Sequence, residues 1–185
     1  MKNTYKNVLI SGNIDIGKTS LVKKIYELLL ENKCNKNIMG GFYTTEVLNK
    51  EGDRIGFDII NLNNIGKIKF ARKNIKSTYM IDGYGLSMSP FNYMITTLNN
   101  NNKKIHIIDE IGQMQILSSK FKSYVLTKLN DPDIIVFGSI KLSEESSSDF
   151  VKEIHSRNDT LIINITEENR ENTTSSILQK IMVLL

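Results

Sequence analysis

Cysteine, histidine and long apolar runs are scarce in this chain, and their scarcity excludes several kinds of protein. There is one cysteine, Cys34, so no intramolecular disulfide can form. A single cysteine is typical of a protein in a reducing compartment. With only two histidines besides it, the chain offers no His/Cys cluster of the kind that holds zinc. No run approaches the roughly 18 apolar residues of a transmembrane helix, and the first strand pattern is too short for a signal-peptide core. We therefore expect a soluble, cytoplasmic protein.

The charge is mildly positive, with a net charge of +4 and a pI of about 9.0. This balance suits an anionic phosphate ligand without requiring nucleic acid. The densest basic stretch is 67–76, which holds one aromatic residue. We favour a solvated edge strand there, with lysines that block aggregation, over a nucleic-acid surface.

A glycine motif near the start carries the strongest functional signal. Residues 12–19 read Gly-Asn-Ile-Asp-Ile-Gly-Lys-Thr and match the P-loop pattern G-x-x-x-x-G-K-[ST]. A buried-strand pattern precedes the motif at 6–11, and an amphipathic helix pattern follows at 19–32. In a P-loop the backbone N–H groups surround the phosphates, Lys18 reaches the β- and γ-phosphates, and the Thr19 hydroxyl binds Mg²⁺. The predicted nucleotide-binding residues of the loop are Gly12, Asn13, Ile14, Asp15, Ile16, Gly17, Lys18, Thr19 and Ser20.

The rest of the chain alternates strand and helix patterns, which is typical of a parallel sheet covered by helices. Strand patterns lie at 105–108, 134–138 and 161–164, and helix patterns at 90–99, 118–129, 146–157 and 170–185. Two β-rich runs, Phe42–Leu48 and Arg54–Ile60, flank a polar segment with a glycine and predict a hairpin. Short strands near 68–70 and 79–81 extend this region.

These patterns predict one α/β domain over 1–185 with the P-loop NTPase fold. We expect a five-stranded, mainly parallel sheet flanked by helices. The antiparallel hairpin region, at about 41–85, would be an insertion into that core.

Two acids, Asp109 and Glu110, directly follow the strand pattern at 105–108. In such a sheet the ligand binds at the carboxyl ends of the strands, so this position lies beside the P-loop. We predict that Asp109, together with Thr19, holds Mg²⁺, with Asp109 acting through water because Mg²⁺ keeps part of its hydration shell. Glu110 is the candidate that orients and deprotonates an attacking water.

Four segments resemble the signature segments of the small nucleoside-triphosphatase family that includes the human cancer-related NTPase and thermophile relatives. They are Gly41–Val47, Arg54–Asp58, Ile107–Met114 and Ile165–Arg170. The resemblance implies a kinase-like P-loop core that hydrolyses nucleoside triphosphates with Mg²⁺ and limited base selectivity. It also implies that the hairpin, with Glu46 and Arg54, forms a wall near the site.

The chain departs from that family pattern at two places. The family's loop has Pro and a third Gly at its middle, whereas this chain has Asn13, Ile14 and Asp15. A carboxylate at Asp15 would repel phosphate if it turned inward. The family also carries Lys and Glu around the Met after the Asp-Glu pair, where this chain has Gln113 and Gln115. This second difference predicts slower or differently tuned turnover.

The cation that offsets charge on the γ-phosphoryl group is left open among Arg54, Arg157 and Arg170. An arginine finger contributes about 10³–10⁵-fold in related systems. We favour Arg54 as a catalytic residue, beside Glu110 and Lys18, because its hairpin should abut the loop. Asn169 and Arg170 open the last helix pattern just after a strand pattern, a position suited to contacting base or ribose.

The leading hypothesis is therefore Mg²⁺-dependent hydrolysis of ATP, GTP and other nucleoside triphosphates to diphosphate and phosphate by a cytoplasmic monomer. The first alternative is a nucleotide or nucleoside kinase, which uses the same loop. Against it, the lid-like segment 141–148 contains no arginine, whereas phosphotransferase lids usually carry one or more. The second alternative, which we favour least, is a nucleotide-gated protein that binds nucleic acid through 67–76.

Overall fold

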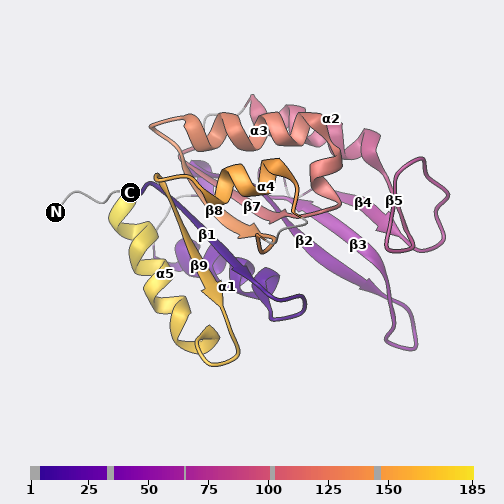
Figure 1. Cartoon of the computed structure of the whole chain (residues 1–185), viewed down its shortest axis with the longest axis horizontal. Helices are drawn as coiled ribbons and strands as arrows, with labels where there is room; N and C mark the ends of the chain where they lie inside the picture. Colours follow the sequence, from indigo (N-terminus) through magenta and orange to yellow (C-terminus); the bar gives the residue numbers. More distant parts are fainter. Residues whose placement is uncertain (1–4, 33–35, 65, 101–102, 144–146) are drawn as a thin grey trace.

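A single mixed sheet forms the centre of the molecule, with helices on both of its faces (Figure 1). The computed structural model describes residues 5–32, 36–64, 66–100, 103–143 and 147–185. Cys34 and residues 144–146 lie outside the described residues. Within these ranges the sheet has nine strands in the order β5-β6-β4-β3-β2-β7-β8-β1-β9.

The elements have the following bounds. The strands are β1 Asn7–Gly12, β2 Met39–Leu48, β3 Arg54–Asn61, β4 Lys67–Arg72, β5 Met80–Ile81, β6 Tyr84–Leu86, β7 Ile105–Ile111, β8 Ile135–Ile140 and β9 Thr160–Ile165. The α-helices are α1 Lys18–Glu31, α2 Met88–Asn99, α3 Ser119–Asn130, α4 Asp149–His155 and α5 Arg170–Leu184, and two 3-10 turns are η1 Lys36–Ile38 and η2 Gln115–Leu117.

One half of the sheet is parallel. The strands β2, β7, β8, β1 and β9 pair in that order, all in the same direction. Such strands are covered on both faces, which explains the near-continuous apolar runs of β1 and β8. The P-loop strand β1 and the strand of the two acids, β7, are not neighbours, because β8 lies between them.

The other half is antiparallel, and it corrects the expected five-stranded sheet. The hairpin β2–β3 forms as predicted, and β4, β6 and β5 continue the same sheet beyond it. Because β2 pairs with β7 on one side and with β3 on the other, it belongs to both halves. The basic strand β4 lies between β3 and β6 at its Ala71–Arg72 end, so the edge strand expected there is partly interior.

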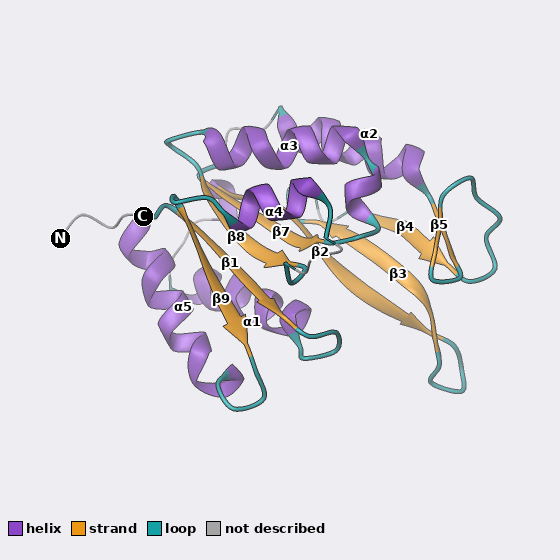
Figure 2. Ribbon diagram, in the orientation of Figure 1, coloured by secondary structure: helices purple, strands orange, loops and turns teal. Residues whose placement is uncertain are grey.

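The helices, which Figure 2 draws in purple around the sheet, are held on its two faces by two apolar layers. Helices α2, α3 and α4 pack on one face, and α1 and α5 pack on the other. The Ser148 hydroxyl accepts a hydrogen bond from the Val151 N–H at 3.4 Å and caps α4, which therefore begins later than the predicted helix over 146–157.

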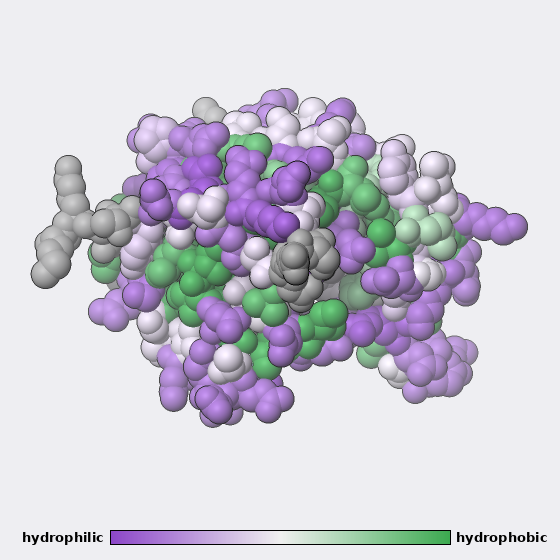
Figure 3. Space-filling model, viewed as in Figure 1, coloured by the Kyte–Doolittle hydropathy of each residue, from purple (hydrophilic) through white to green (hydrophobic). Residues whose placement is uncertain are grey.

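No helix within the described ranges is long and apolar enough to cross a membrane. On the face shown in Figure 3, hydrophilic side chains cover most of the surface and apolar residues form smaller patches.

A buried carboxylate ties the antiparallel half together. Asp58 on β3 is 1% exposed and accepts hydrogen bonds from Lys67 Nζ at 2.8 Å and from the Arg72 guanidinium, both on β4. Arg72 also donates to the Phe57 and Ala71 carbonyls at 2.9 and 2.7 Å. Burial acts to raise the pKa of Asp58, but the hydrogen bonds and charges of Lys67 and Arg72 outweigh it and hold that pKa below its usual range.

Asp58→Asn is expected to lower the free energy of unfolding by about 2–4 kcal/mol, because it leaves the largely buried Arg72 without its counter-charge. Since the folded-state pKa is depressed, this stabilisation is fully present above the ordinary aspartate pKa of about 4 and is lost as the pH falls below it. Urea unfolding from pH 3 to 7 measures both effects, with the exposed hairpin variant Glu51→Gln as the control. An unfolding midpoint at pH 7 equal to that of the wild type would contradict the prediction.

Candidate functional site

The P-loop joins the end of β1 to the start of α1 through a backbone that only certain residues adopt. Gly12 has φ 151°, and a Cβ there would lie 2.6 Å from the Ile165 carbonyl oxygen at the end of β9. Gly17 has φ 97° and stands at the N-cap of α1. Asp15 is also left-handed, at φ 61°, a conformation that Asp tolerates better than most residues with a Cβ. Asp15 therefore takes the left-handed turn at the middle of the loop without a glycine.

Lys18 lies across this loop. Its Nζ donates to the Gly12 and Asn13 carbonyl oxygens at 2.9 and 2.7 Å. Lys18 is also the first residue of α1, so the N–H groups at that helix's N-terminus adjoin the P-loop. A helix N-terminus and an ammonium group together favour an anion at this position.

Asp109 lies near the end of β7 and is fully buried. Its Oδ1 accepts hydrogen bonds from the Ser139 hydroxyl at 2.6 Å and the Thr19 hydroxyl at 3.3 Å. Its Oδ2 accepts from the Thr44 backbone N–H at 3.3 Å, and the Thr44 hydroxyl donates to the Asp109 carbonyl at 2.7 Å. The contact with Thr19 joins the P-loop to β7, across the intervening strand β8.

Two of these partners, Ser139 and Thr44, were not predicted as site residues. Ser139 is a polar residue within the otherwise apolar, fully buried strand β8, and that pattern is the signal that could have identified it. Thr44 lies in Gly41–Val47, which carries the family resemblance, but that resemblance implied no role for Thr44. Both are brought to Asp109 by strand pairing.

The pKa of Asp109 is raised by its burial, against the opposing hydrogen bonds of Ser139, Thr44 and Thr19 and the charge of Lys18. The Asp109 carboxylate and the Thr19 hydroxyl are both hard oxygen donors, which are the ligands that Mg²⁺ prefers. Since Mg²⁺ takes one or two protein ligands and completes its shell with water and substrate phosphate, these two residues fit it.

Glu110 follows Asp109 through a cis peptide bond and is half-buried. Burial and the neighbouring Asp109 charge raise its pKa, while Lys18 and Lys141 act in the opposite direction. The Glu110 side chain lies against Gly112, where a Cβ would come within 2.9 Å of the Glu110 Cδ. Gly112 therefore leaves the space that the Glu110 carboxyl group uses.

Arg54 opens strand β3 and reaches the P-loop. Its Nη1 donates to Asp15 Oδ1 at 3.2 Å and to Glu46 Oε1 at 2.6 Å. Its guanidinium lies over the Phe57 ring, 5.5 Å from the ring centroid. The Asp15 side chain is 68% exposed, and its carboxylate is paired with Arg54 at the surface of the loop.

The structure places the two other candidate arginines differently. Arg157 pairs with Asp159 at 2.9 and 2.7 Å and donates to the Leu129 carbonyl at 3.1 Å. This position is at the amino end of β9, whereas the P-loop lies at the carboxyl end of β1, so Arg157 is removed as a candidate. Arg170 is exposed at the start of α5.

Asn169 holds the turn between β9 and α5. Its Oδ1 accepts from the Thr166 N–H and its Nδ2 donates to the Asn164 carbonyl, both at 2.9 Å. Because β9 pairs with β1 up to Gly12, this turn lies at the same end of the sheet as the P-loop.

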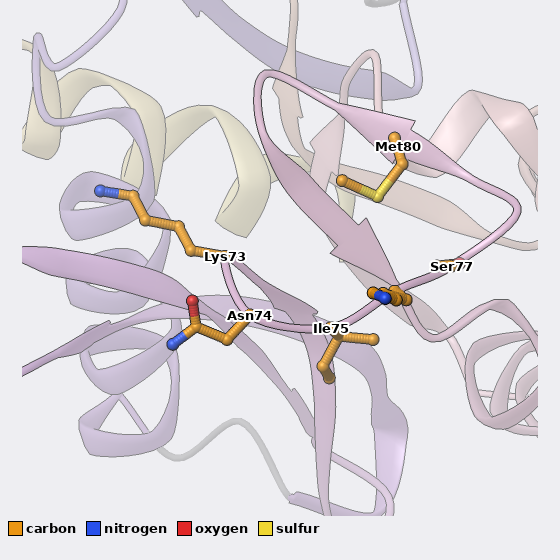
Figure 4. A pocket seen from close by; sticks show the side chains of 6 residues that line it. Lys73, Asn74, Ile75, Ser77 and Met80 are labelled. Carbon is orange, nitrogen blue, oxygen red and sulfur yellow. The ribbon is translucent and has the colours of Figure 1, made fainter.

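A hollow of about 420 Å³ lies elsewhere, in the connection between β4 and β5 (Figure 4). The residues that line it are Lys73, Asn74, Ile75, Lys76, Ser77 and Met80. They belong to one continuous segment, which takes in 73–76 of the basic stretch at 67–76 and includes none of the predicted nucleotide-site residues. The candidate chemistry therefore lies at the P-loop.

Comparisons with known proteins agree on one family. The model of the family described as NTPase matches residues 7–178. The nucleoside-triphosphatase THEP1 of Thermotoga sp. (strain RQ2) is 37% identical over 174 residues, which cover 92% of each chain. The crystal structure of THEP1 from Aquifex aeolicus has a TM-score of 0.79 at 31% identity and covers 95% of this chain and 98% of its own. The solution structure of a human cancer-related nucleoside triphosphatase has a TM-score of 0.80 at 27% identity, with 95% and 97% covered. With its P-loop, its Asp-Glu strand end and these likenesses over nearly the whole length, the chain belongs to the NTPase family.

Proposed function

We propose that this protein hydrolyses nucleoside triphosphates to nucleoside diphosphate and phosphate in the presence of Mg²⁺. The observation that carries the proposal is the 3.3 Å contact between Thr19 Oγ1 and Asp109 Oδ1, which brings the P-loop and the Asp-Glu pair into one site. The relatives that cover more than nine-tenths of the chain are named nucleoside-triphosphatases, which supports hydrolysis.

The P-loop would bind the triphosphate. The backbone N–H groups of 13–19 surround the phosphates, and the Lys18 ammonium exchanges its bonds to the Gly12 and Asn13 carbonyls for phosphate oxygens. Asn169 and Arg170, at the same end of the sheet, are our candidates for contacts with the base or ribose. Low base selectivity is part of the proposal.

Thr19 and Asp109 are the residues that would hold Mg²⁺. When bound, the ion neutralises charge that develops on the β- and γ-phosphate oxygens. Ser139 and Thr44 fix the Asp109 carboxylate through its two oxygens, so the carboxylate is oriented before any ligand binds.

Glu110 would act on water. Its carboxylate accepts a proton from the water whose oxygen forms a bond to the γ-phosphorus, while the bond from that phosphorus to the β–γ bridging oxygen breaks. The electron pair leaves with the diphosphate, near Lys18. Burial raises the pKa of Glu110, which makes it a stronger proton acceptor than an ordinary carboxylate. We further propose that Arg54 offsets charge on the γ-phosphoryl group and that one domain carries out the reaction as a cytoplasmic monomer.

Phosphate release should occur with Mg²⁺ and any of ATP, GTP, CTP, UTP and their deoxy forms, without an added acceptor. Chelation of the metal with EDTA should lower the rate by about 100-fold or more, because the charge on the phosphates is then left uncompensated. A coupled phosphate assay measures both. A Lys18→Ala preparation, purified in parallel, controls for contaminating phosphatases. Phosphate release only when a nucleoside or nucleotide acceptor is added would instead favour the kinase alternative.

A further inference from the structure

We infer that Asp15 is a positioning residue, which holds Arg54 at the P-loop so that the guanidinium is placed for the γ-phosphoryl group before the substrate binds. This inference rests on the proposed hydrolysis and deepens it. It assigns a role to Asp15, the one acid in the P-loop.

Both carboxylates bind the same nitrogen of the Arg54 guanidinium. Asp15 Oδ1 and Glu46 Oε1 both meet Arg54 at Nη1, at 3.2 and 2.6 Å. Neither ion pair uses Nη2 or Nε, so these two nitrogens can donate to phosphate oxygens while both pairs persist. The two carboxylates therefore orient the arginine without consuming all of its donors.

Three separate elements fix this arrangement. Asp15 comes from the centre of the P-loop, Glu46 from β2, and Arg54 from the start of β3. The Phe57 ring supports the guanidinium from a third side, 5.5 Å from its centroid. The left-handed backbone of Asp15 sets the direction in which its carboxylate leaves the loop.

The exposure of these groups argues against a role in stability. Asp15 is 68% exposed, Glu46 52% and Arg54 35%, and ion pairs this open to solvent stabilise a fold very little. Charge also matters, because an unpaired carboxylate in a P-loop repels phosphate. With Arg54 bound to it, the Asp15 carboxylate is compensated locally. We therefore attribute the Asp15–Arg54 ion pair to the binding and reaction of the triphosphate and not to the stability of the fold.

Kinetics of Asp15 and Arg54 variants test the inference. Asp15→Ala should lower kcat about 10-fold, since a misplaced catalytic group loses much of its effect, and should change KM by less than about threefold. Asp15→Asn keeps an acceptor oxygen toward Arg54 and should retain more of the wild-type kcat than Asp15→Ala. Asp15→Ala combined with Arg54→Ala should be no slower than Arg54→Ala alone. Glu51→Ala, which removes an exposed acid from the same hairpin, is the matched control and should behave as wild type.

Two results would overturn the inference. One is an Asp15→Ala effect on kcat that multiplies with that of Arg54→Ala. The other is an unchanged kcat with a lower KM, which would mean that Asp15 only weakens phosphate binding by repulsion. An unchanged kcat in Asp15→Ala excludes positioning whether KM falls or stays the same.

A binding measurement separates this inference from the proposed function. If the wild-type protein releases no phosphate from any triphosphate, the proposed function fails. Calorimetry with Mg²⁺·ADP, with and without aluminium fluoride as the mimic of the transferred phosphoryl group, then tests Asp15 directly. Asp15→Ala and Arg54→Ala should both reduce the preference for the fluoride complex. An undiminished preference in Asp15→Ala would refute the positioning role.

Discussion

Replacing Glu110 with glutamine is expected to lower kcat by about 10²–10⁴-fold, which is the usual contribution of a positioned general base. Glutamine keeps the shape of the side chain beside Gly112 but cannot accept the proton of water. Nucleotide affinity should stay within about threefold of the wild type, because Glu110 is assigned to water and not to the phosphates.

Phosphate release and the binding of a fluorescent ATP analogue measure these two properties separately. Glu153→Gln, an exposed substitution of the same kind on α4, is the matched control. Hydrolysis by Glu110→Gln at the wild-type rate would remove Glu110 from the mechanism.

Lys18→Ala is expected to lose binding as well as turnover. The ammonium group makes charge-assisted bonds to phosphate oxygens in the bound state, so its loss should weaken affinity by about 10–100-fold. Turnover should fall further, because the same charge stabilises the leaving diphosphate.

A calorimetric titration with a non-hydrolysable ATP analogue measures the affinity. Lys24→Ala removes an exposed lysine from the same helix and should bind as the wild type does. If Lys18→Ala binds the analogue with wild-type affinity, the phosphates do not lie in this loop. Together, the Glu110 and Lys18 variants separate chemistry from binding.

The parts of the site that could be predicted are those that are contiguous in sequence. The P-loop spacing and the acids after an apolar strand need no knowledge of which strands are neighbours. Ser139 and Thr44 contact Asp109 only because β8 and β2 both pair with β7, and single-sequence patterns do not reveal strand order. The same topology places Arg157 at the opposite end of the sheet from the P-loop, although the sequence left it open as a candidate beside the favoured Arg54.

The extent of the sheet could not be predicted for a related reason. Alternating strand and helix patterns describe the parallel half, where crossovers separate the strands. The β-rich runs of β2 and β3 predict a hairpin correctly, but nothing in them indicates that this hairpin continues the core sheet. Asp15 is a third case, because the direction of its carboxylate depends on the left-handed backbone at φ 61° and on a partner 39 positions away.

Strand β2 pairs with both β3 and β7, and it sets the distance between two groups of the site. Thr44 and Glu46 are two positions apart on this strand, so both side chains point to the same side of the sheet, about 7 Å from each other. One holds the buried aspartate and the other holds the arginine. The pleat of a single strand thereby fixes the separation of the two groups, and changes in the length of the turn at 49–53 leave it intact. A slip of β2 by one residue would instead release both groups at once.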